Sequence, residues 1–349
     1  MLSYDVIEWR KPLQPIERAT PTPNGTEVLL RLKYCGVCHS DVHIRDGYFD
    51  LGGGKRLEMS ERGMRLPATL GHEPFGTVIA AGPEAGDVPI GADRLVYPWT
   101  GCGECVRCRG SLDNYCMAAR MIGIQRPGGY ADHLIVPHPR YLIDASGIDP
   151  VWAAMLSCSG LSTYSAVSKL KPIPGDEWVA VMGAGGLGLS AIGMLRALGH
   201  KRIVAVDIDG TKLQEAEKAG AAMTLNSRGD SAQKLKQLTQ GALYGAVDFV
   251  GSGDTANLAL GALRKGGKLI LVGLFGGEIS LSIAGTSLRA IAIQGSHVGS
   301  VDELKTVVAL ARQGKISPIP FEKRPLSEVS RTLDELKAGS VIGRVVVEI

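Results

Sequence analysis

Four cysteines lie close together in one turn-rich segment of the sequence. Cys102, Cys105, Cys108 and Cys116 have the spacing C-x2-C-x2-C-x7-C. Four thiolates that leave no open coordination position are typical of a structural, tetrahedral zinc site. An iron–sulfur cluster is the chemical alternative, but its motif places the fourth cysteine after three residues and before a proline. A disulfide pair is less consistent with a chain that shows no secretory signal. We therefore predict a structural zinc site.

A second set of metal-binding side chains is spread over three polar segments. Cys38, His72 and Cys158 each lie in a different one of them. Together they offer two soft thiolates and one imidazole, although none of the three segments is decisive alone. This set leaves a fourth ligand position free for water or a substrate oxygen, as a catalytic zinc requires.

A glycine-rich segment fits the pattern G-x-G-x-x-G. Its residues are Gly183, Ala184, Gly185, Gly186, Leu187 and Gly188. An apolar strand is predicted directly before it and an apolar helix directly after it, which is the context that gives this pattern its meaning. The glycines allow a tight turn, a close approach of a pyrophosphate and close packing of helix on strand. The N-terminus of the helix offers free N–H groups to the phosphates. We therefore predict a dinucleotide-binding site.

An acidic residue ends the next predicted strand. Asp207 lies nineteen residues beyond Gly188. A carboxylate at this position hydrogen-bonds the ribose 2′-hydroxyl and repels a 2′-phosphate, so NAD is favoured over NADP. Lys212 lies in the first turn of the next predicted helix and is placed to reach the same ribose. Asp209 is the alternative acid, and we expect it to face solvent.

The elements that must position these residues differ between the two parts of the chain. Up to about residue 150 the sequence consists of short β-like runs between glycines and prolines, such as Val28–Tyr34, Gly76–Ala81, Arg94–Tyr97 and His133–Pro137. From Asp149 onward, helical and strand-like segments alternate, which predicts βαβ units on a parallel sheet. The predicted helices are Asp149–Lys169, Leu187–Leu198, Thr211–Lys218 and Val301–Arg312, and the predicted strands are Glu177–Met182, Arg202–Val206, Ala246–Val250, Lys268–Val272 and Ala290–Gly295.

Composition limits the class of protein. The 349 residues are 45% apolar and 21% charged with a formal charge of +3, so the chain is globular rather than disordered. Like charges do not form blocks, which argues against nucleic-acid and membrane-surface partners. The charge-free stretch Trp178–Leu195 contains five glycines and is better read as strand, turn and helix than as a membrane span. The N-terminus lacks the core of a signal peptide, and we predict a cytoplasmic protein.

The order of these motifs resembles that of the zinc-containing medium-chain alcohol dehydrogenases over essentially the whole chain, including the ending Gly343-Arg344-Val345-Val346. The resemblance implies an α/β protein with a GroES-like β-barrel catalytic domain and a Rossmann coenzyme domain with a doubly wound parallel sheet. The catalytic domain would be formed by residues 1–158 and 297–349, and the NAD-binding domain by residues 159–296. The last ~50 residues would thus rejoin the first.

The resemblance also implies roles for individual residues. Cys38, His72 and Cys158 resemble the ligands of the catalytic zinc, and Glu73 resembles a nearby carboxylate that can approach the metal. Asp41 resembles the acid that orients His72. Ser40 and His43 resemble the inner and outer steps of a proton relay. The resemblance further implies coenzyme contacts from His39, Ser162, Val272, Gly273, Leu274, Ser296, His297, Val298 and Arg344.

The implied activity is the zinc-dependent oxidation of an alcohol to an aldehyde or ketone, and the reverse reduction, with hydride transfer to NAD. A polyol dehydrogenase is one alternative, disfavoured because that branch commonly has a carboxylate in place of Cys158. A zinc-free quinone or enone reductase is another, although it would not need Cys38, His72 and Cys158 together. A third is a nucleotide-binding protein without turnover. The implied partners are a small-molecule substrate and copies of the same chain, as a tetramer or a dimer.

One segment departs from the family pattern. Phe49–Arg65 includes Gly52-Gly53-Gly54 and seven charged residues, and it is longer than expected between these motifs. In the family this region borders the substrate cleft. The sequence leaves two interpretations open: the segment reshapes specificity, or it is a surface insertion.

Overall fold

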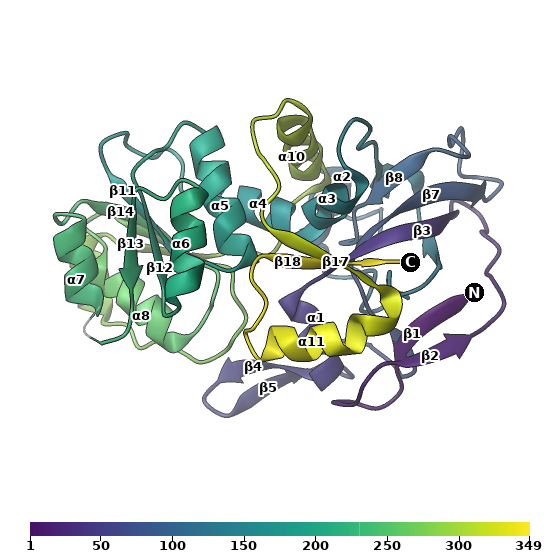
Figure 1. Cartoon of the computed structure of the whole chain (residues 1–349), viewed down its shortest axis with the longest axis horizontal. Coiled ribbons are helices and arrows are strands. Elements are labelled where there is room, and N and C mark those ends of the chain that lie inside the picture. The colour runs from purple at the N-terminus through teal and green to yellow at the C-terminus, as the bar shows by residue number, and fades with distance from the viewer. Residues whose placement is uncertain (230) are drawn as a thin grey trace.

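The computed structural model describes residues 1–229 and 231–349. Within them the chain forms an α/β structure with one large parallel sheet, one large and mainly antiparallel sheet, and two small sheets (Figure 1). Six described strands form the parallel sheet in the order β13-β12-β11-β14-β15-β16. These strands are β11 (Trp178–Met182), β12 (Ile203–Asp207), β13 (Met223–Asn226), β14 (Leu243–Asp248), β15 (Lys268–Leu271) and β16 (Ala292–Gly295).

Helices cover both faces of the parallel sheet. Those on one face are α4 (Leu161–Lys169), α5 (Gly186–Ala197) and α6 (Gly210–Lys218), and those on the other are α7 (Ser231–Leu238) and α8 (Gly253–Ala262). Every residue of β11 is buried, and Val179 and Val181 face one helical layer while Ala180 and Met182 face the other. An uninterrupted apolar run is what a strand buried on both faces requires. The strand order reverses between β11 and β14, which is where doubly wound sheets bind ligands.

The second large sheet joins the two ends of the chain. The described strands follow the path β10-β8-β7-β3-β18-β17, and β9 also pairs with β3. C-terminal β18 runs antiparallel to β3, and Figure 1 shows it crossing to the N-terminal part of the chain. The strands are β3 (Val28–Val37), β7 (Glu73–Ala81), β8 (Asp93–Val96), β9 (His133–Val136), β10 (Leu142–Ile143), β17 (Phe321–Pro325) and β18 (Arg344–Glu348).

The remaining described strands and helices belong to both halves of the molecule, and among them α9 lies between β15 and β16 in the sequence. The small strands are β1 (Leu2–Val6), β2 (Gln14–Glu17) and β6 (Ala68–Thr69), which form one sheet, and β4 (Tyr48–Gly52) and β5 (Lys55–Glu58), which form a hairpin. The other helices are α1 (His39–Asp46), α2 (Val106–Arg109), α3 (Pro150–Met155), α9 (Ile283–Arg289), α10 (Val301–Arg312) and α11 (Val329–Lys337).

The predicted helix Asp149–Lys169 is interrupted by a π-helical turn. The structure has α3, then the π-helical turn Leu156–Gly160, then α4. Hydroxyl groups within this region hydrogen-bond to backbone carbonyls, as when Ser159 donates to Met155 at 2.7 Å. Such turns are frequent at functional sites because they change the direction of a side chain. This one carries Cys158.

None of the helices in the described residues is long and apolar enough to cross a membrane. The charge-free stretch Trp178–Leu195 forms β11 and most of α5, as predicted.

Candidate active site

Donor atoms from Cys38, His72, Glu73 and Cys158 lie within 4.8 Å of one another in a buried cluster. The Sγ atoms of Cys38 and Cys158 are 4.0 Å apart. Two thiolates that bind one tetrahedral zinc at about 2.3 Å lie about 3.8 Å apart, so this spacing fits the metal. Nε2 of His72 is buried and has no hydrogen-bond partner among the described residues. Because buried nitrogens rarely lack a partner, this atom is consistent with a metal ligand.

Asp41 orients the imidazole of His72. One Asp41 carboxylate oxygen lies 3.0 Å from Nδ1 of His72, and the other accepts hydrogen bonds from the Tyr130 hydroxyl at 2.8 Å and the Cys38 backbone N–H at 3.0 Å. Burial, together with the nearby Asp41, raises the pKa of Tyr130 well above its usual value, so the phenol stays a donor. The carboxylate therefore fixes the ring orientation and directs Nε2 toward the two thiols, as partners of metal-ligating histidines do.

A buried ion pair connects this cluster with the neighbouring cleft. The guanidinium of Arg344, at the start of β18, donates to one oxygen of Glu73, at the start of β7. The other oxygen of Glu73 is buried without a hydrogen-bond partner among the described residues. Burial raises the pKa of Glu73 to about 7, opposed by the positive charge of Arg344. The predicted role of Arg344 did not include this contact, which depends on strands far apart in the sequence.

Helix α1 presents the predicted proton-relay residues. Its first residues are His39 and Ser40, and the Ser40 hydroxyl lies 3.7 Å from Sγ of Cys38. One turn further on, the ring of His43 stands 5.3 Å from that of His39 and 5.4 Å from that of Phe49. Burial lowers the pKa of both histidines below the usual 6.5. The relay itself stays a prediction.

The four-cysteine segment forms a second donor cluster. Cys102, Cys105, Cys108 and Cys116 place their Sγ atoms within 4.8 Å of one another, with neighbouring pairs 3.5–3.9 Å apart. These separations are too long for a disulfide and fit four thiolates around one zinc ion. Backbone N–H groups of Cys102 and Cys105 donate to Sγ atoms at 3.4 Å.

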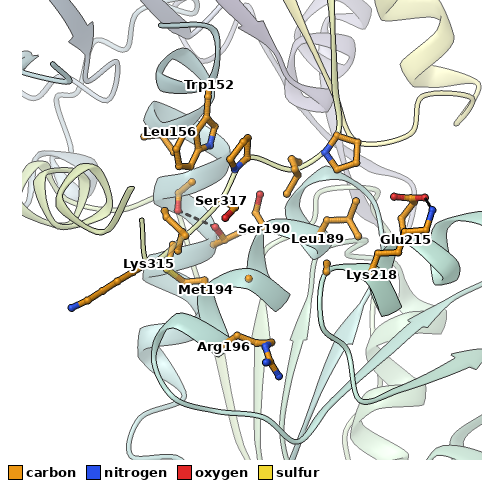
Figure 2. Close-up of a pocket in the computed structure, with 18 residues that line it drawn as sticks. Trp152, Leu156, Leu189, Ser190, Met194, Arg196, Glu215, Lys218, Lys315 and Ser317 are labelled. Carbon is orange, nitrogen blue, oxygen red and sulfur yellow. Dashed lines mark hydrogen bonds and ion pairs between the residues drawn. The ribbon is translucent and has the colours of Figure 1, made fainter. Parts of the chain in front are cut away.

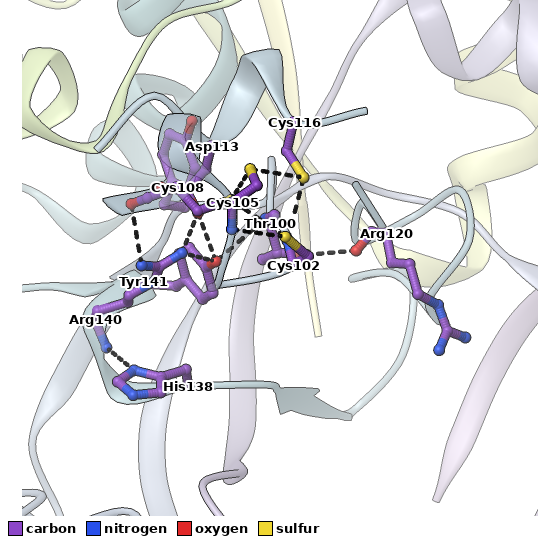
Figure 3. Close-up of polar contacts among 12 residues, drawn as sticks. Thr100, Cys102, Cys105, Cys108, Asp113, Cys116, Arg120, His138, Arg140 and Tyr141 are labelled. Carbon is purple, nitrogen blue, oxygen red and sulfur yellow. Dashed lines mark hydrogen bonds and ion pairs between the residues drawn. The ribbon is translucent and has the colours of Figure 1, made fainter. Parts of the chain in front are cut away.

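Polar contacts join this lobe to neighbouring segments of the chain, as Figure 3 shows. Asp113 is buried and accepts hydrogen bonds from Tyr141 at 2.8 Å and from Arg140. Thr100 donates to the backbone carbonyl of Arg120 on the other side of the cysteines. The lobe thus has anchored ends, which suits a stabilising role.

A cleft of about 300 Å³ brings together most of the predicted coenzyme residues. It lies at the carboxyl edge of the parallel sheet, where the strand order reverses between β11 and β14. The predicted residues that line it are Cys38, His39, Ser40, His43, Gly183, Gly185, Gly186, Leu187, Gly188, Asp207, Lys212, Val272, Gly273, Leu274 and Arg344. The other lining residues were not predicted from the sequence, and they are Phe249, Val250, Phe275, Leu336, Gly339, Val341 and Gly343. Val250 was detectable, because it ends a predicted strand at this edge.

The glycine loop has the backbone geometry that its pattern predicts. Gly183 has φ +87°, a conformation that other residues rarely adopt. A Cβ on Gly188 would lie 1.9 Å from the carbonyl oxygen of Gly183, so helix and loop pack without room for a side chain. A Cβ on Gly185 would meet nothing within 4 Å among the described residues. The open space at Gly185, beside the N-terminus of α5, fits a pyrophosphate.

Asp207 lies at the end of β12 and already binds the neighbouring backbone. One carboxylate oxygen accepts from the N–H of Ala184 at 2.7 Å, and the other from the N–H of Asp209 at 3.0 Å. Asp209 in turn caps α6 through the N–H of Thr211. Lys212 donates to the carbonyl of Gly339 at 3.2 Å across the cleft. Asp207 therefore ties the glycine loop to β12, in addition to its predicted contact with ribose.

The other predicted coenzyme residues lie outside the cleft lining. Ser162 is buried in α4, and Ser296, His297 and Val298 follow β16. The ring of Trp99 lies 5.3 Å from that of His72 and 5.9 Å from that of His297. Trp99 thus lies between the donor cluster and the 296–298 segment. Its position near a turn in the sequence did not predict these two contacts.

A second cavity lies on the other side of α5. It has a volume of about 440 Å³ and lies between α5, α6 and residues 315–320, as Figure 2 shows. Its walls include Trp152 and Met194, and Lys218 and Glu215 form an ion pair of 2.6 Å at one side. Its described lining contains none of the predicted metal or coenzyme residues. The chemistry therefore belongs to the cleft on the other side of the helix.

Comparisons with known proteins identify two family models in this chain. Residues 24–146 match the alcohol dehydrogenase GroES-like domain, and residues 186–313 match the zinc-binding dehydrogenase domain. NAD-dependent alcohol dehydrogenases of Sulfurisphaera tokodaii and Saccharolobus solfataricus are each 35% identical over 346 residues, which is 99% of both chains in each comparison. The crystal structure of the alcohol dehydrogenase from the archaeon Aeropyrum pernix is 30% identical and has a TM-score of 0.90, with 100% of both chains covered.

Proposed function

The chain belongs to the zinc-binding alcohol dehydrogenases with a GroES-like domain, and from this premise we propose that it oxidises an alcohol to an aldehyde or ketone with NAD and catalyses the reverse reduction. The observation that carries the proposal is the position of the buried donor cluster. Cys38 belongs both to this cluster and to the lining of the cleft that holds the glycine loop. A metal and a dinucleotide would therefore meet at one place.

Two zinc ions and NAD are the cofactors of this proposal. Cys38, His72 and Cys158 would hold the catalytic ion, with Glu73 beside it, and Cys102, Cys105, Cys108 and Cys116 would hold the structural ion. When bound, the catalytic zinc supplies a Lewis acid for the substrate oxygen, and the nicotinamide accepts the hydride. Cys158 favours an alcohol dehydrogenase over the polyol branch, which commonly has a carboxylate there.

The protein's own contribution to the chemistry is proton transfer and positioning. Ser40 stands next to Cys38 at the floor of the cleft, so its hydroxyl is placed to take the proton of the substrate hydroxyl. His43 lines the same cleft one helical turn away and is neutral at pH 7, because burial lowers its pKa. It is placed to accept the proton from Ser40 and pass it to solvent.

We propose the coenzyme contacts along the cleft from its geometry, and those of Ser162 and Ser296–Val298, which lie outside its lining, from the family resemblance. The glycine loop and the N-terminus of α5 would bind the pyrophosphate, with His39 and Arg344 supplying positive charge. Asp207 and Lys212 would bind the adenosine ribose. Backbone groups of Val272–Leu274 and Ser296–Val298, together with Ser162, would hold the nicotinamide.

The domain division remains our proposal: residues 1–158 with 297–349 form the catalytic domain, and residues 159–296 form the coenzyme domain. The division is supported by the sheets, since the strands of the parallel sheet all come from 178–295 and those of the other large sheet from 28–143 and 321–348.

We also propose a homo-oligomer, a tetramer or a dimer. The support is an apolar surface around α9 and the edge strand β16. Among the described residues, Ile283 is 86% exposed, Leu288 75% and Phe275 66%. A sheet edge beside exposed apolar side chains is typical of a surface that another chain covers.

A cytoplasmic location completes the proposal. All seven cysteines are free in the structure, and two clusters of reduced thiols are easiest to maintain in a reducing compartment.

Metal content tests the two-site assignment. Purified protein should contain about two zinc ions per chain by elemental analysis, and it should reduce NAD in an absorbance assay with a panel of primary, secondary and aromatic alcohols.

Cys105→Ser should remove the structural ion only, and it should lower Tm by several degrees, since 1 kcal/mol corresponds to about 2–4 °C in a large domain. Turnover per remaining zinc should change little. One zinc or none in the wild-type protein would contradict the assignment.

Coenzyme preference tests Asp207. Asp207→Gly should narrow the ratio of kcat/KM for NAD to that for NADP by about 10- to 100-fold, because a charged hydrogen bond is worth about 1.5–3 kcal/mol and the repulsion of the 2′-phosphate is also lost. Asp207→Asn is the matched variant, since it keeps an acceptor for the Ala184 N–H but removes the charge. A wild-type protein that uses NADP more efficiently than NAD would show that Asp207 does not select the coenzyme.

A further inference from the structure

The segment Phe49–Arg65, which the sequence left with two interpretations, begins with a hairpin that reaches across the molecule. β4 pairs antiparallel with β5, and Gly52 faces Lys55 across the turn. The turn residues Gly53 and Gly54 have φ +56° and +75°, as a type I′ turn requires. Figure 1 shows the hairpin below α11, between the two halves of the molecule.

The hairpin tip touches a loop of the parallel-sheet half with almost no space between the backbones. This loop, residues 275–278, follows β15. A Cβ on Gly52 would lie 2.7 Å from the carbonyl carbon and oxygen of Gly277, and a Cβ on Gly276 would lie 2.7 Å from Cβ of Asp50. Atoms closer than 3.0 Å would have to move apart. The 275–278 loop therefore leaves room only for glycine at position 52, and the hairpin leaves room only for glycine at position 276. A small cavity of about 250 Å³ lies beside the contact.

The loop and the hairpin that form this contact are each connected to residues of the proposed site. The loop directly follows Val272–Leu274, which lines the coenzyme cleft. Its backbone is tied to the turn after β14, because Phe275 donates to Val250 at 3.2 Å and Gly276 donates to Gly251 at 3.0 Å. On the other side, Phe49 of β4 is buried against the ring of His43.

We infer that Gly52 and Gly276, at the contact of the hairpin tip with the 275–278 loop, are positioning residues that hold Val272–Leu274 against the nicotinamide end of the bound dinucleotide. The inference rests on the proposed function. The tip has a fixed turn and a reciprocal glycine contact, so it sets the distance between the hairpin and the loop. A methyl group inserted there must push the loop, and the residues directly before it, away from the hairpin.

Gly52→Ala is the direct test, with Gly54→Ala as the matched control. Both glycines have similar positive φ values, so alanine strains the backbone equally at each. A Cβ on Gly54, however, meets nothing within 4 Å among the described residues. The probes are NADH and ADP-ribose, which lacks the nicotinamide. Gly52→Ala should weaken NADH binding about tenfold, leave ADP-ribose binding unchanged and lower kcat by up to about 10²-fold. Gly54→Ala should leave all three within about twofold of wild type.

A second variant protects the test against misfolding of Gly52→Ala. Asp50→Ala removes the carboxylate that accepts the Gly52 N–H at 2.7 Å, and Asp50 is exposed, so the fold should tolerate it. Asp50→Ala should weaken the binding of NADH less than Gly52→Ala does, and it should leave the binding of ADP-ribose unchanged. The inference would be overturned if these variants bound both probes equally more weakly than the wild type, or if they bound both probes as tightly as the wild type. Failure of ADP-ribose to bind the wild-type protein would instead overturn the proposed function, and the inference with it.

Discussion

Replacing Cys158 with alanine should lower turnover by at least about 10³-fold while the fold is kept. The Lewis acid of such a site supplies several kcal/mol of transition-state stabilisation, and each 1.36 kcal/mol is a factor of ten in rate. The structure leaves only Cys38 and His72, with Glu73 beside them, once this thiol is removed. Zinc content should fall from about two ions per chain to about one.

Cys35 offers a control matched in residue type and burial. It is fully buried in β3, three residues before Cys38, and belongs to neither donor cluster. Cys35→Ala should cost some stability through a small cavity, but it should keep both zinc ions and nearly full turnover. Steady-state kinetics, elemental analysis and circular dichroism of the two variants give the comparison. A Cys158→Ala protein that keeps two zinc ions and wild-type turnover would show that the catalytic ligands lie elsewhere.

Local patterns in the sequence were sufficient to predict most of the parallel-sheet half of the fold, although β13 was missed and the predicted strand Ala246–Val250 is observed at Leu243–Asp248. The apolar run at 178–182 and the glycines at 183–188 are contiguous, and their geometry depends on neighbours in the chain. The predicted strand at 202–206 and helix at 211–218 are likewise found within one residue of the observed ends. These elements carry their own hydrophobic period and end signals, so they were readable without tertiary information.

Features that depend on contacts distant in sequence were not predictable. The bond between Glu73 and Arg344 joins residues from β7 and β18, and Trp99 meets His72 and His297 from a loop. The π-helical turn at Leu156–Gly160 contains the pair Ser159-Gly160, which was too weak a signal to predict the interruption. In each case the cause is packing around the cluster, which overrides local preference.

The donor cluster shows how much a resemblance adds to such patterns. Cys38, His72 and Cys158 come from three segments, and spacing alone offered only a plausible set of ligands. The structure gathers them in one buried cluster because β3, β7 and the π-helical turn meet there. Helix α1 begins at this point, so the same turn that places Cys38 also places Ser40.

Ser40 should be the more sensitive of the two proton-relay residues. Its hydroxyl lies in the cleft beside Cys38, so Ser40→Ala removes the only relay group that we propose to contact the substrate oxygen. General acid–base assistance is worth about 10²–10⁴-fold, and turnover should fall by that order. Ser40→Thr keeps a hydroxyl and should recover part of the loss.

His43→Ala should cost less, because water can replace a group at the outer end of the relay, and its main effect should be on the pH profile of alcohol oxidation. Burial lowers the pKa of His43 below 6.5. The neutral, accepting form therefore prevails above that pKa, and wild-type rates should fall as the pH drops through it. The variant should lack this inflection when rates are measured from about pH 5 to pH 10.

If both residues only stabilise the turn after β3, the two variants would lose stability and rate without any change in pH dependence. Equal, pH-independent losses in Ser40→Ala and His43→Ala would therefore remove the relay from the mechanism.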